Sequence, residues 1–316
     1  MIRSIRTDEL AVRLSLDGIG ISIGGATVRL RSDVDGLAVA LQAVYGQYPL
    51  EPSAGFFDAT IEIRRVAGFR RYFRPQIELI LDAATPFEPF PADTHLPLME
   101  WGMNHALAER YLHSLLLHAG VVEKRGVAVV LPAVPGSGKS TLTAALMCSG
   151  YRLLSDEFGA LSLATGMLTP MLKPIALKNE SIPEIRRRYP QATMGPVFPR
   201  TRKGDVGHLA PDARSIELRS QPGLPRLVLF PTFVRGASVQ LDRVDAATAF
   251  GKLAVNSFNY EFLGIQSFDA VARLVTTCTC KRIVFSDLSE AVQSIDHMVD
   301  DLAGGQSIHC SGGAGQ

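Results

Sequence analysis

The sequence predicts an α/β fold, in which a mixed sheet is flanked by helices, preceded by a smaller β-rich N-terminal domain. Three observations lead to this prediction. Apolar and polar residues alternate along much of residues 1–97, as in half-buried strands. Strand-like and helix-like segments alternate along residues 98–303, which is typical of α/β domains. The stretch TPFEPFPADTHLP (85–97) lies at the end of the first part, and we interpret it as a linker because proline interrupts helices and central strands.

In the β-rich part, alternating apolar and polar residues predict strands, and glycine turns separate the first three of them. The predicted strands are 11–16, 19–23, 27–30, 60–66 and 76–81. The second part begins with a predicted helix over 98–117, followed by strands at 119–122 and 127–131. A helix over 141–149 then ends at Gly150, since glycine favours the left-handed conformation that terminates helices.

The rest of the second part continues to alternate between strands and helices. Further strands are predicted at 152–155, near 161 and 175, and at 215–218, 227–230 and 282–285. Further helices are predicted at 182–189, 246–255, 268–276 and 288–302. Residues 304–316, which are rich in glycine, are expected to form a disordered tail.

The composition is that of an ordinary globular protein, because 47% of the 316 residues are hydrophobic and 20% are charged. Lys and Arg number 32 against 31 Asp and Glu, so no basic excess predicts nucleic-acid binding. No apolar run approaches the roughly 18 residues of a membrane span, and the N-terminus lacks the apolar core of a signal peptide. The four cysteines are too scattered for a disulfide framework. We therefore expect reduced cysteines and a cytoplasmic protein with no membrane or nucleic-acid partner.

A phosphate-binding loop (P-loop) motif, AVPGSGKS over residues 133–140, stands between a predicted strand and a predicted helix. Its glycines let the backbone curl so that N–H groups face an anion, and the positive end of the following helix adds attraction. Lys139 is placed to reach the β- and γ-phosphates, and Ser140 offers a hydroxyl to Mg²⁺. The alternative is a glycine turn without a ligand. The residues predicted to bind the nucleotide are Pro135, Gly136, Ser137, Gly138, Lys139, Ser140 and Thr141.

Two acidic residues, Asp156 and Glu157, follow the predicted strand at 152–155. If this strand is parallel to the one before the P-loop, its C-terminal end lies next to the nucleotide. Acidic groups there can hold Mg²⁺ or accept a proton from an attacking hydroxyl. Ser140, Asp156 and Glu157 are therefore the predicted metal ligands, and a helix cap or a solvated turn is the alternative for the acidic pair.

Two further segments combine polar and apolar residues, as pocket walls often do, because buried amides need hydrogen-bond partners. The first supplies Lys178 and Asn179, and the second supplies Asn256 and Asn259. All four are predicted substrate-binding residues, with a capped helix end or a surface loop as the alternative for each segment. His118 precedes the P-loop strand, and a lone histidine is by itself more often structural.

The chain resembles the HPr kinase/phosphorylase superfamily, in particular its HPr-kinase-related kinase A branch. The resemblance lies in the order and spacing of three segments, which are His118-Ala-Gly120, the P-loop and Leu154-Ser-Asp-Glu157. The resemblance covers roughly residues 112–179 and implies a P-loop kinase core of the HPr kinase type. It also implies that His118, Lys139 and Asp156 are catalytic, with Asp156 as the base toward a substrate hydroxyl. Glu157 stands where HPr kinase has Asp. The oligomeric HPr kinases suggest a homo-oligomer.

The sequence thus predicts a kinase that uses ATP and Mg²⁺ to phosphorylate a hydroxyl of a protein, a peptide or a small molecule. One alternative is a nucleotide-dependent switch or NTPase without a covalent acceptor, which favours a longer apolar strand before the acidic residue than 152–155. Another is a binding scaffold with a vestigial nucleotide site. The intact Lys139, Ser140 and Asp156 argue against it.

Overall fold

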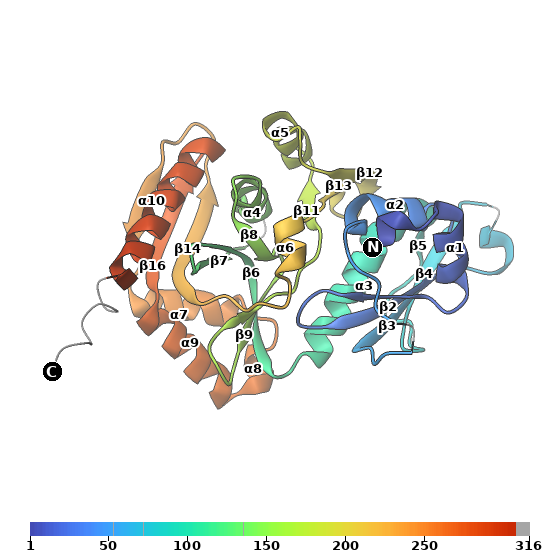
Figure 1. The fold of residues 1–316 in the computed structure, drawn as a ribbon, viewed down its shortest axis with the longest axis horizontal. Helices are drawn as coiled ribbons and strands as arrows, with labels where there is room; N and C mark the ends of the chain where they lie inside the picture. The colour runs from blue at the N-terminus through green and yellow to red at the C-terminus, as the bar shows by residue number, and fades with distance from the viewer. Residues whose placement is uncertain (53, 72, 135, 308–316) are drawn as a thin grey trace. The chain divides into compact units, whose positions relative to one another are not determined.

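The chain forms two compact units in the computed structural model, which describes residues 1–52, 54–71, 73–134 and 136–307. Unit 1 comprises Met1–Tyr111 and Lys173–Glu217, and unit 2 comprises Leu112–Leu172 and Leu218–Gln316. The chain therefore passes between the units three times. The predicted class, α/β with mixed sheets flanked by helices, is confirmed (Figure 1).

The division into units differs from the predicted boundary between residues 97 and 98. The stretch 85–97 is not a linker, because it contains β5 (Phe90–Pro91), the 3₁₀ helix η3 (Ala92–Thr94) and the start of helix α3 (His95–Arg110). Pro97 is tolerated there because the N–H groups of a first helical turn have no acceptor within the helix. Helix α3 packs on the N-terminal sheet, so its sequence belongs to the core of unit 1.

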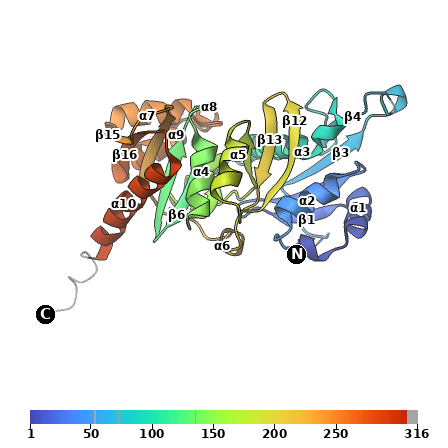
Figure 2. The same cartoon turned by 90° about the horizontal axis from the view of Figure 1, so that it is seen from above.

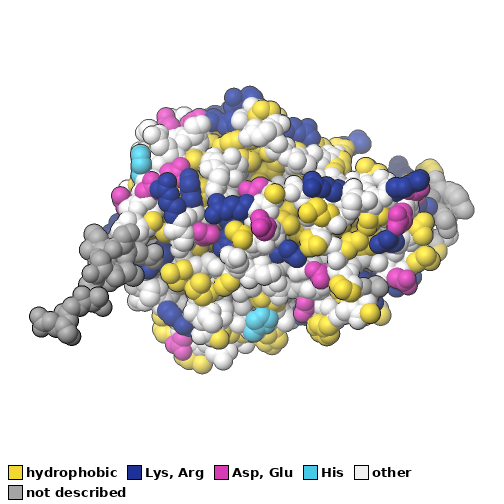
Figure 3. Space-filling view, in the orientation of Figure 1, with side chains coloured by type: hydrophobic (Ala, Val, Ile, Leu, Met, Phe, Trp, Pro, Cys, Tyr) yellow, Lys and Arg dark blue, Asp and Glu magenta, His cyan; other side chains and the backbone are white. Residues whose placement is uncertain are grey.

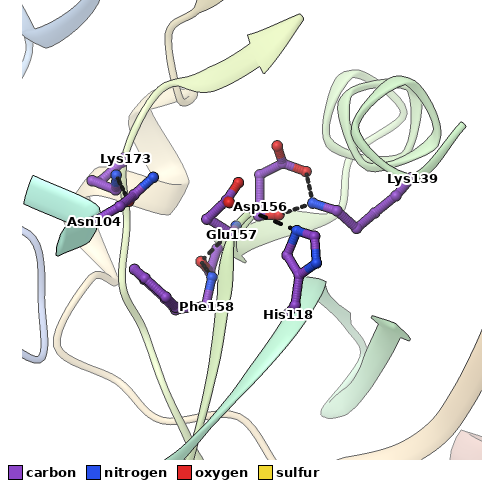
Figure 4. A network of polar contacts seen from close by, with 8 residues as sticks. Asn104, His118, Lys139, Asp156, Glu157, Phe158 and Lys173 are labelled. Carbon is purple, nitrogen blue, oxygen red and sulfur yellow. Dashed lines mark hydrogen bonds and ion pairs between the residues drawn. The ribbon is translucent and has the colours of Figure 1, made fainter. Parts of the chain in front are cut away.

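The segment that begins at Lys173 joins unit 1 partly through a buried polar cluster. Lys173 Nζ lies 3.1 Å from Glu100 Oε2 of α3, and both side chains are less than 10% exposed. Lys173 also donates to Asn104 Oδ1, as Figure 4 shows. The Tyr45 hydroxyl donates to Glu100 Oε1 at 2.5 Å. Because buried charges require partners, this cluster ties together segments that are far apart in the sequence.

Unit 1 contains two sheets. A mixed sheet has the order β1-β2-β3-β4-β5, with β1 (Ile19–Ser22), β2 (Thr27–Ser32), β3 (Ala59–Arg65) and β4 (Gln76–Leu81) close to the predicted ranges. An antiparallel sheet has the order β11-β13-β12, with β11 (Ile175–Lys178), β12 (Met194–Thr201) and β13 (Gly204–Leu209). The helical segments of unit 1 are η1 (Ile2–Ser4), α1 (Thr7–Ser15), α2 (Leu37–Tyr45), η2 (Gly68–Arg71), α3, α5 (Ser181–Arg188) and α6 (Ala213–Glu217).

Two predicted strands of unit 1 are helices in the structure. Helix α1 replaces the strand at 11–16, because Leu10 and Leu14 are buried four residues apart and Arg13 pairs with Glu9 one turn earlier. Helix α6 replaces the strand at 215–218. Helix α2 was not predicted, since six of its nine residues are buried and its sequence therefore lacks a polar face.

Unit 2 is built on a mixed eight-stranded sheet in the order β10-β9-β6-β7-β14-β16-β15, with β8 also paired to β6. The strands are β6 (Ser114–Lys124), β7 (Val127–Pro132), β8 (Arg152–Ser155), β9 (Phe158–Ser162), β10 (Leu168–Thr169), β14 (Pro225–Phe233), β15 (Gln240–Arg243) and β16 (Thr279–Phe285). The helices are α4 (Lys139–Cys148), α7 (Ala246–Val255), α8 (Tyr260–Leu263), α9 (Ile265–Thr277) and α10 (Leu288–Ser307).

Helices cover both faces of this sheet. Odd-numbered residues of β6, such as Leu117 and Val121, share a core with residues of α7 and α9. Helices α4 and α10 contact each other and the strands β6, β7 and β16, so they lie on the opposite face, as Figure 2 shows. Since successive residues of a strand face opposite sides, the even-numbered residues of β6 face the α4 side.

The predicted helix over 98–117 is wrong at its C-terminal end, which belongs to strand β6. The helix α3 ends at Arg110, and residues 114–117 belong to β6, which is buried along most of its length. A strand that is buried on both faces reads as a continuous apolar run, which periodicity alone does not distinguish from a buried helix.

At the C-terminal end, α10 continues to Ser307, so the predicted disordered tail begins too early. Residues 308–316 of that predicted tail lie outside the described residues. In the part of the chain that the structure describes, no helix combines the length and hydrophobicity required to cross a bilayer. Figure 3 shows basic, acidic and apolar side chains interspersed on the visible face, in agreement with the near-zero net charge.

Candidate functional site

The sheet of unit 2 brings the predicted site segments to one edge. Strand β6 is antiparallel to β7 and to β8, so β7 and β8 run in the same direction with β6 between them. Ala119 lies opposite Pro132, and Val121 lies opposite Ser155. His118 precedes Ala119 in β6, so it lies with the P-loop after β7 and the acidic pair after β8 where β7 and β8 end. The strand at 152–155 therefore meets the condition of running parallel to the P-loop strand, although β8 does not pair with β7.

The P-loop has the backbone conformation that its glycines allow. Gly136 and Gly138 have φ angles of 87° and 86°, a left-handed conformation that favours glycine. A Cβ atom at Gly138 would also lie 3.0 Å from Phe233 Cβ. The Phe233 N–H donates to the Ser137 carbonyl at 3.0 Å, which fixes the loop to the end of β14. The predicted ligand residue Pro135 lies outside the described residues.

Lys139 and Asp156 form a buried ion pair between the P-loop helix and the end of β8 (Figure 4). Lys139 Nζ lies 3.2 Å from Asp156 Oδ1 and also donates to the main-chain oxygen of Asp156. The two side chains are 8% and 6% exposed. The P-loop cation and the predicted base are therefore brought together in a site that excludes most water.

The environment of Asp156 raises the pKa of its carboxyl group above the ordinary 3.8. Burial is the largest cause, because it disfavours the charged form. The Lys139 charge acts in the opposite direction, the Glu157 charge raises the pKa further, and a hydrogen bond with the Ser140 side chain lowers it. A raised pKa makes a carboxylate a better proton acceptor when it is ionised.

His118 lies beside this pair on the same face of the sheet. Its Nε2 atom is 3.6 Å from Glu157 Oε1, and the two side chains are 23% and 34% exposed. The ring of Phe258 lies 5.4 Å from the His118 ring and 4.8 Å from the Phe158 ring, centroid to centroid. Phe258 is 47% exposed. The site therefore has a polar, partly accessible side with an aromatic wall.

Gly120 has a packing role that the sequence analysis did not identify. A Cβ atom there would lie 2.3 Å from Thr143 Oγ1 of α4, so only glycine permits the observed approach of α4 to β6. The signal was available, because a glycine inside a buried strand often marks a close approach of another element. Two residues earlier on the same face of β6 stands His118.

The amide of Asn259 does not line the site. Its Oδ1 accepts from the Leu116 N–H at 2.9 Å, and its Nδ2 donates to the Ser114 carbonyl at 3.0 Å. The residue is 5% exposed, so it satisfies the backbone of β6 rather than a substrate. Asn256 contributes its carbonyl, which accepts from the His118 N–H at 2.7 Å.

The other two predicted substrate residues belong to unit 1. Lys178 ends β11, where Ser181 Oγ accepts from its N–H at 2.9 Å. Asn179 has a φ angle of 48° and accepts from the Asp205 N–H at 3.1 Å. Both residues therefore form a turn between β11 and α5, and the structure does not bring them into the P-loop unit.

The P-loop residues fit a nucleotide phosphate. Among the described residues, Ser137 Oγ is buried without a hydrogen-bond partner, and the first N–H groups of α4 are of the kind that binds anions. Ser140 and Thr141 lie half-buried in the first turn of α4. No group of three or more His, Cys, Asp or Glu suited to a metal occurs among the described residues. A Mg²⁺ site here would therefore combine Ser140 and the acidic pair with phosphate and water oxygens.

The chain was compared with protein-family models and with curated proteins, and neither comparison produced a match.

Proposed function

We propose that this protein is an ATP-dependent kinase with a P-loop core like that of the HPr kinases, which phosphorylates a hydroxyl group of a protein, a peptide or a small molecule. The observation that carries the proposal is the Lys139–Asp156 pair, in which Nζ and Oδ1 are 3.2 Å apart. Phosphoryl transfer depends mainly on positioning and on neutralising charge. A buried cation at the phosphate loop beside a buried carboxylate supplies both.

The residues have distinct roles in this proposal. The backbone N–H groups of the P-loop bind the phosphates, and Lys139 neutralises the charge on the transferring group. Asp156 accepts the proton of the substrate hydroxyl, and the hydroxyl oxygen forms a bond to the γ-phosphorus of ATP. The bond between the γ-phosphorus and the oxygen that bridges it to the β-phosphate breaks, and ADP leaves. Mg²⁺, when bound, neutralises phosphate charge, and Ser140, Asp156 and Glu157 would hold it. His118 positions the Glu157 carboxylate, 3.6 Å away.

The proposal is tested with γ-labelled ATP and the purified protein, alone and with fractionated cell extract. We expect ADP release that depends on an acceptor fraction, together with label in a protein, a peptide or a small molecule. Asp156→Asn is expected to keep ATP binding and to lower transfer by about 10²–10⁴-fold, because it removes a general base. Lys139→Ala is expected to abolish transfer.

The control variant is Asp242→Asn, which changes an exposed acidic residue on the edge strand β15. It is expected to behave as the unaltered protein. Turnover that is unchanged in Lys139→Ala would refute the proposal. Steady hydrolysis without any acceptor requirement would instead support the alternative of a nucleotide-dependent switch or NTPase.

A further inference from the structure

A cavity lies in unit 2, at the other end of the sheet from the P-loop. It is open to solvent, has a volume of about 270 Å³, and is lined by residues of the turn between β9 and β10, the start of β14, and helix α9. Pro225, which begins β14, lies opposite Ala128 near the start of β7. Because the P-loop follows the end of β7, the cavity and the proposed nucleotide site are at opposite edges of the same sheet.

The lining of this cavity combines apolar side chains with two threonines, and its charged residues are all of one sign. Leu161, Ala270 and Leu274 are buried residues of this lining. Of the described residues that line the cavity, two are charged, and both are arginines, Arg226 and Arg273. A pocket with apolar walls and two positive charges is suited to an anion that carries an apolar body.

The two guanidinium groups have unused hydrogen-bonding capacity. Arg273 donates from one nitrogen to the Leu163 carbonyl at 3.2 Å, which leaves most of its five N–H groups. The Arg226 side chain forms no hydrogen bond or ion pair with any described residue. Its charge nevertheless acts on the protein interior. Burial raises the pKa of the Cys278 thiol to about 12, and Arg226 is among the groups that oppose this rise.

We propose that this cavity binds a small carboxylate with an apolar body, with the carboxylate between Arg226 and Arg273 and the body against Leu161 and Leu274. Carboxylates match the guanidinium geometry and form charge-assisted hydrogen bonds with it. Since one water occupies about 30 Å³, the cavity accommodates a ligand of roughly ten non-hydrogen atoms. The apolar walls disfavour a strongly hydrated inorganic anion.

The test is calorimetric titration of the full chain with three carboxylates of increasing apolar size: butyrate, 3-phenylpropionate and octanoate. The neutral 3-phenylpropanamide and inorganic phosphate are titrated alongside. We expect at least one of the carboxylates to bind. The amide and inorganic phosphate are expected to bind at least about tenfold more weakly than that carboxylate. Arg226→Gln and Arg273→Gln are each expected to weaken carboxylate binding by about tenfold or more, since hydrogen bonds to charged groups are the strong ones.

The matched control is Arg243→Gln, which removes an exposed arginine of β15 that does not line the cavity. It is expected to leave the affinity unchanged. Thermal unfolding of each variant shows whether it is folded, and both cavity arginines are at least partly exposed. The proposal is overturned if no carboxylate binds at about 10 mM, which we take as the weak limit of a specific site. It is also overturned if the amide binds as tightly as the acid, or if phosphate binds more tightly than every carboxylate. Finally, it is overturned if either cavity variant binds carboxylates as tightly as Arg243→Gln does.

Discussion

Replacement of Gly120 with alanine is expected to disturb the contact between β6 and the P-loop helix α4. The added Cβ atom would lie 2.3 Å from Thr143 Oγ1, about 1 Å short of an ordinary contact. Thr143 is fully buried, and its Oγ1 donates to the Lys139 carbonyl at 2.9 Å. The clash is therefore relieved either by turning the Thr143 side chain away from Lys139 or by displacing the start of α4.

Both ways of relieving the clash have similar costs. A buried hydroxyl that loses its partner costs about 1–3 kcal/mol, and overpacking that shifts the backbone costs about 1–3 kcal/mol. We expect Gly120→Ala to lower the free energy of unfolding of unit 2 by this amount. Because Lys139 begins α4, we also expect weaker ATP binding. In the double variant with Thr143→Ala, the nearest remaining atom is the Cβ of residue 143 at 3.4 Å, so the double variant should recover at least about 1 kcal/mol relative to the sum of the single changes.

The assay is urea unfolding followed by circular dichroism, combined with titration of a fluorescent ATP analogue. Gly251→Ala in α7 is the control, since a Cβ atom there meets nothing within 4 Å. It should stabilise the protein by about 0.5–1 kcal/mol, because alanine is the better helix former. The reasoning fails if Gly120→Ala is as stable as the unaltered protein, or if the two changes at residues 120 and 143 are additive.

Three further outcomes are expected from other buried groups. Lys173→Met should destabilise unit 1 by about 3–5 kcal/mol, because it leaves Glu100 buried without its cation, and the double variant with Glu100→Gln should recover much of this in denaturant titrations. Burial lowers the pKa of His208 from 6.5 to about 4. His208 becomes protonated below about pH 6.5 in the unfolded chain, but only below about pH 4 in the folded chain. The free energy of unfolding should therefore fall by up to about 3 kcal/mol as the pH is lowered from 6.5 to 4. His208→Gln should flatten that part of a pH series of unfolding curves. Asn259→Ala should cost about 2–4 kcal/mol, because it leaves two buried backbone groups of β6 unpaired, and a calorimetric loss below 0.5 kcal/mol would contradict the structural role.

The sequence predicts best where the local pattern is unambiguous. The strand–loop–helix context of the P-loop and the shared direction of β7 and β8 are recovered, since each depends on a short motif with strong neighbours. The α/β class follows from the same alternation. The strand at 11–16 and the long helix over 98–117 are wrong, because a short apolar run fits both periods and only burial on one or both faces decides between them.

The candidate site shows the same limit. Lys139 is a candidate from the P-loop motif and Asp156 from the acidic pair after a strand, and the sheet brings the two into contact. A glycine inside a buried strand indicates a close approach, but the partner of Gly120, Thr143, and the aromatic neighbour of His118, Phe258, lie more than 20 residues away, and no local pattern encodes them. The polar-aromatic segment around Asn259 predicted a pocket residue, but the Asn259 amide instead forms hydrogen bonds with two backbone groups of β6. Burial requires a partner for an amide without specifying which partner.

The threefold passage of the chain between the units has a consequence for synthesis on the ribosome. Unit 1 needs residues 173–217 to complete its sheets, and Glu100 has no cationic partner until Lys173 has been made. The first strands of the P-loop unit are translated between the two parts of unit 1. Unit 2 in turn needs β14 and β16, which come after residue 217. A nascent chain shorter than 217 residues therefore contains neither unit complete, so the units finish folding late and close together in time, in contrast to domains that fold one after another from the N-terminus.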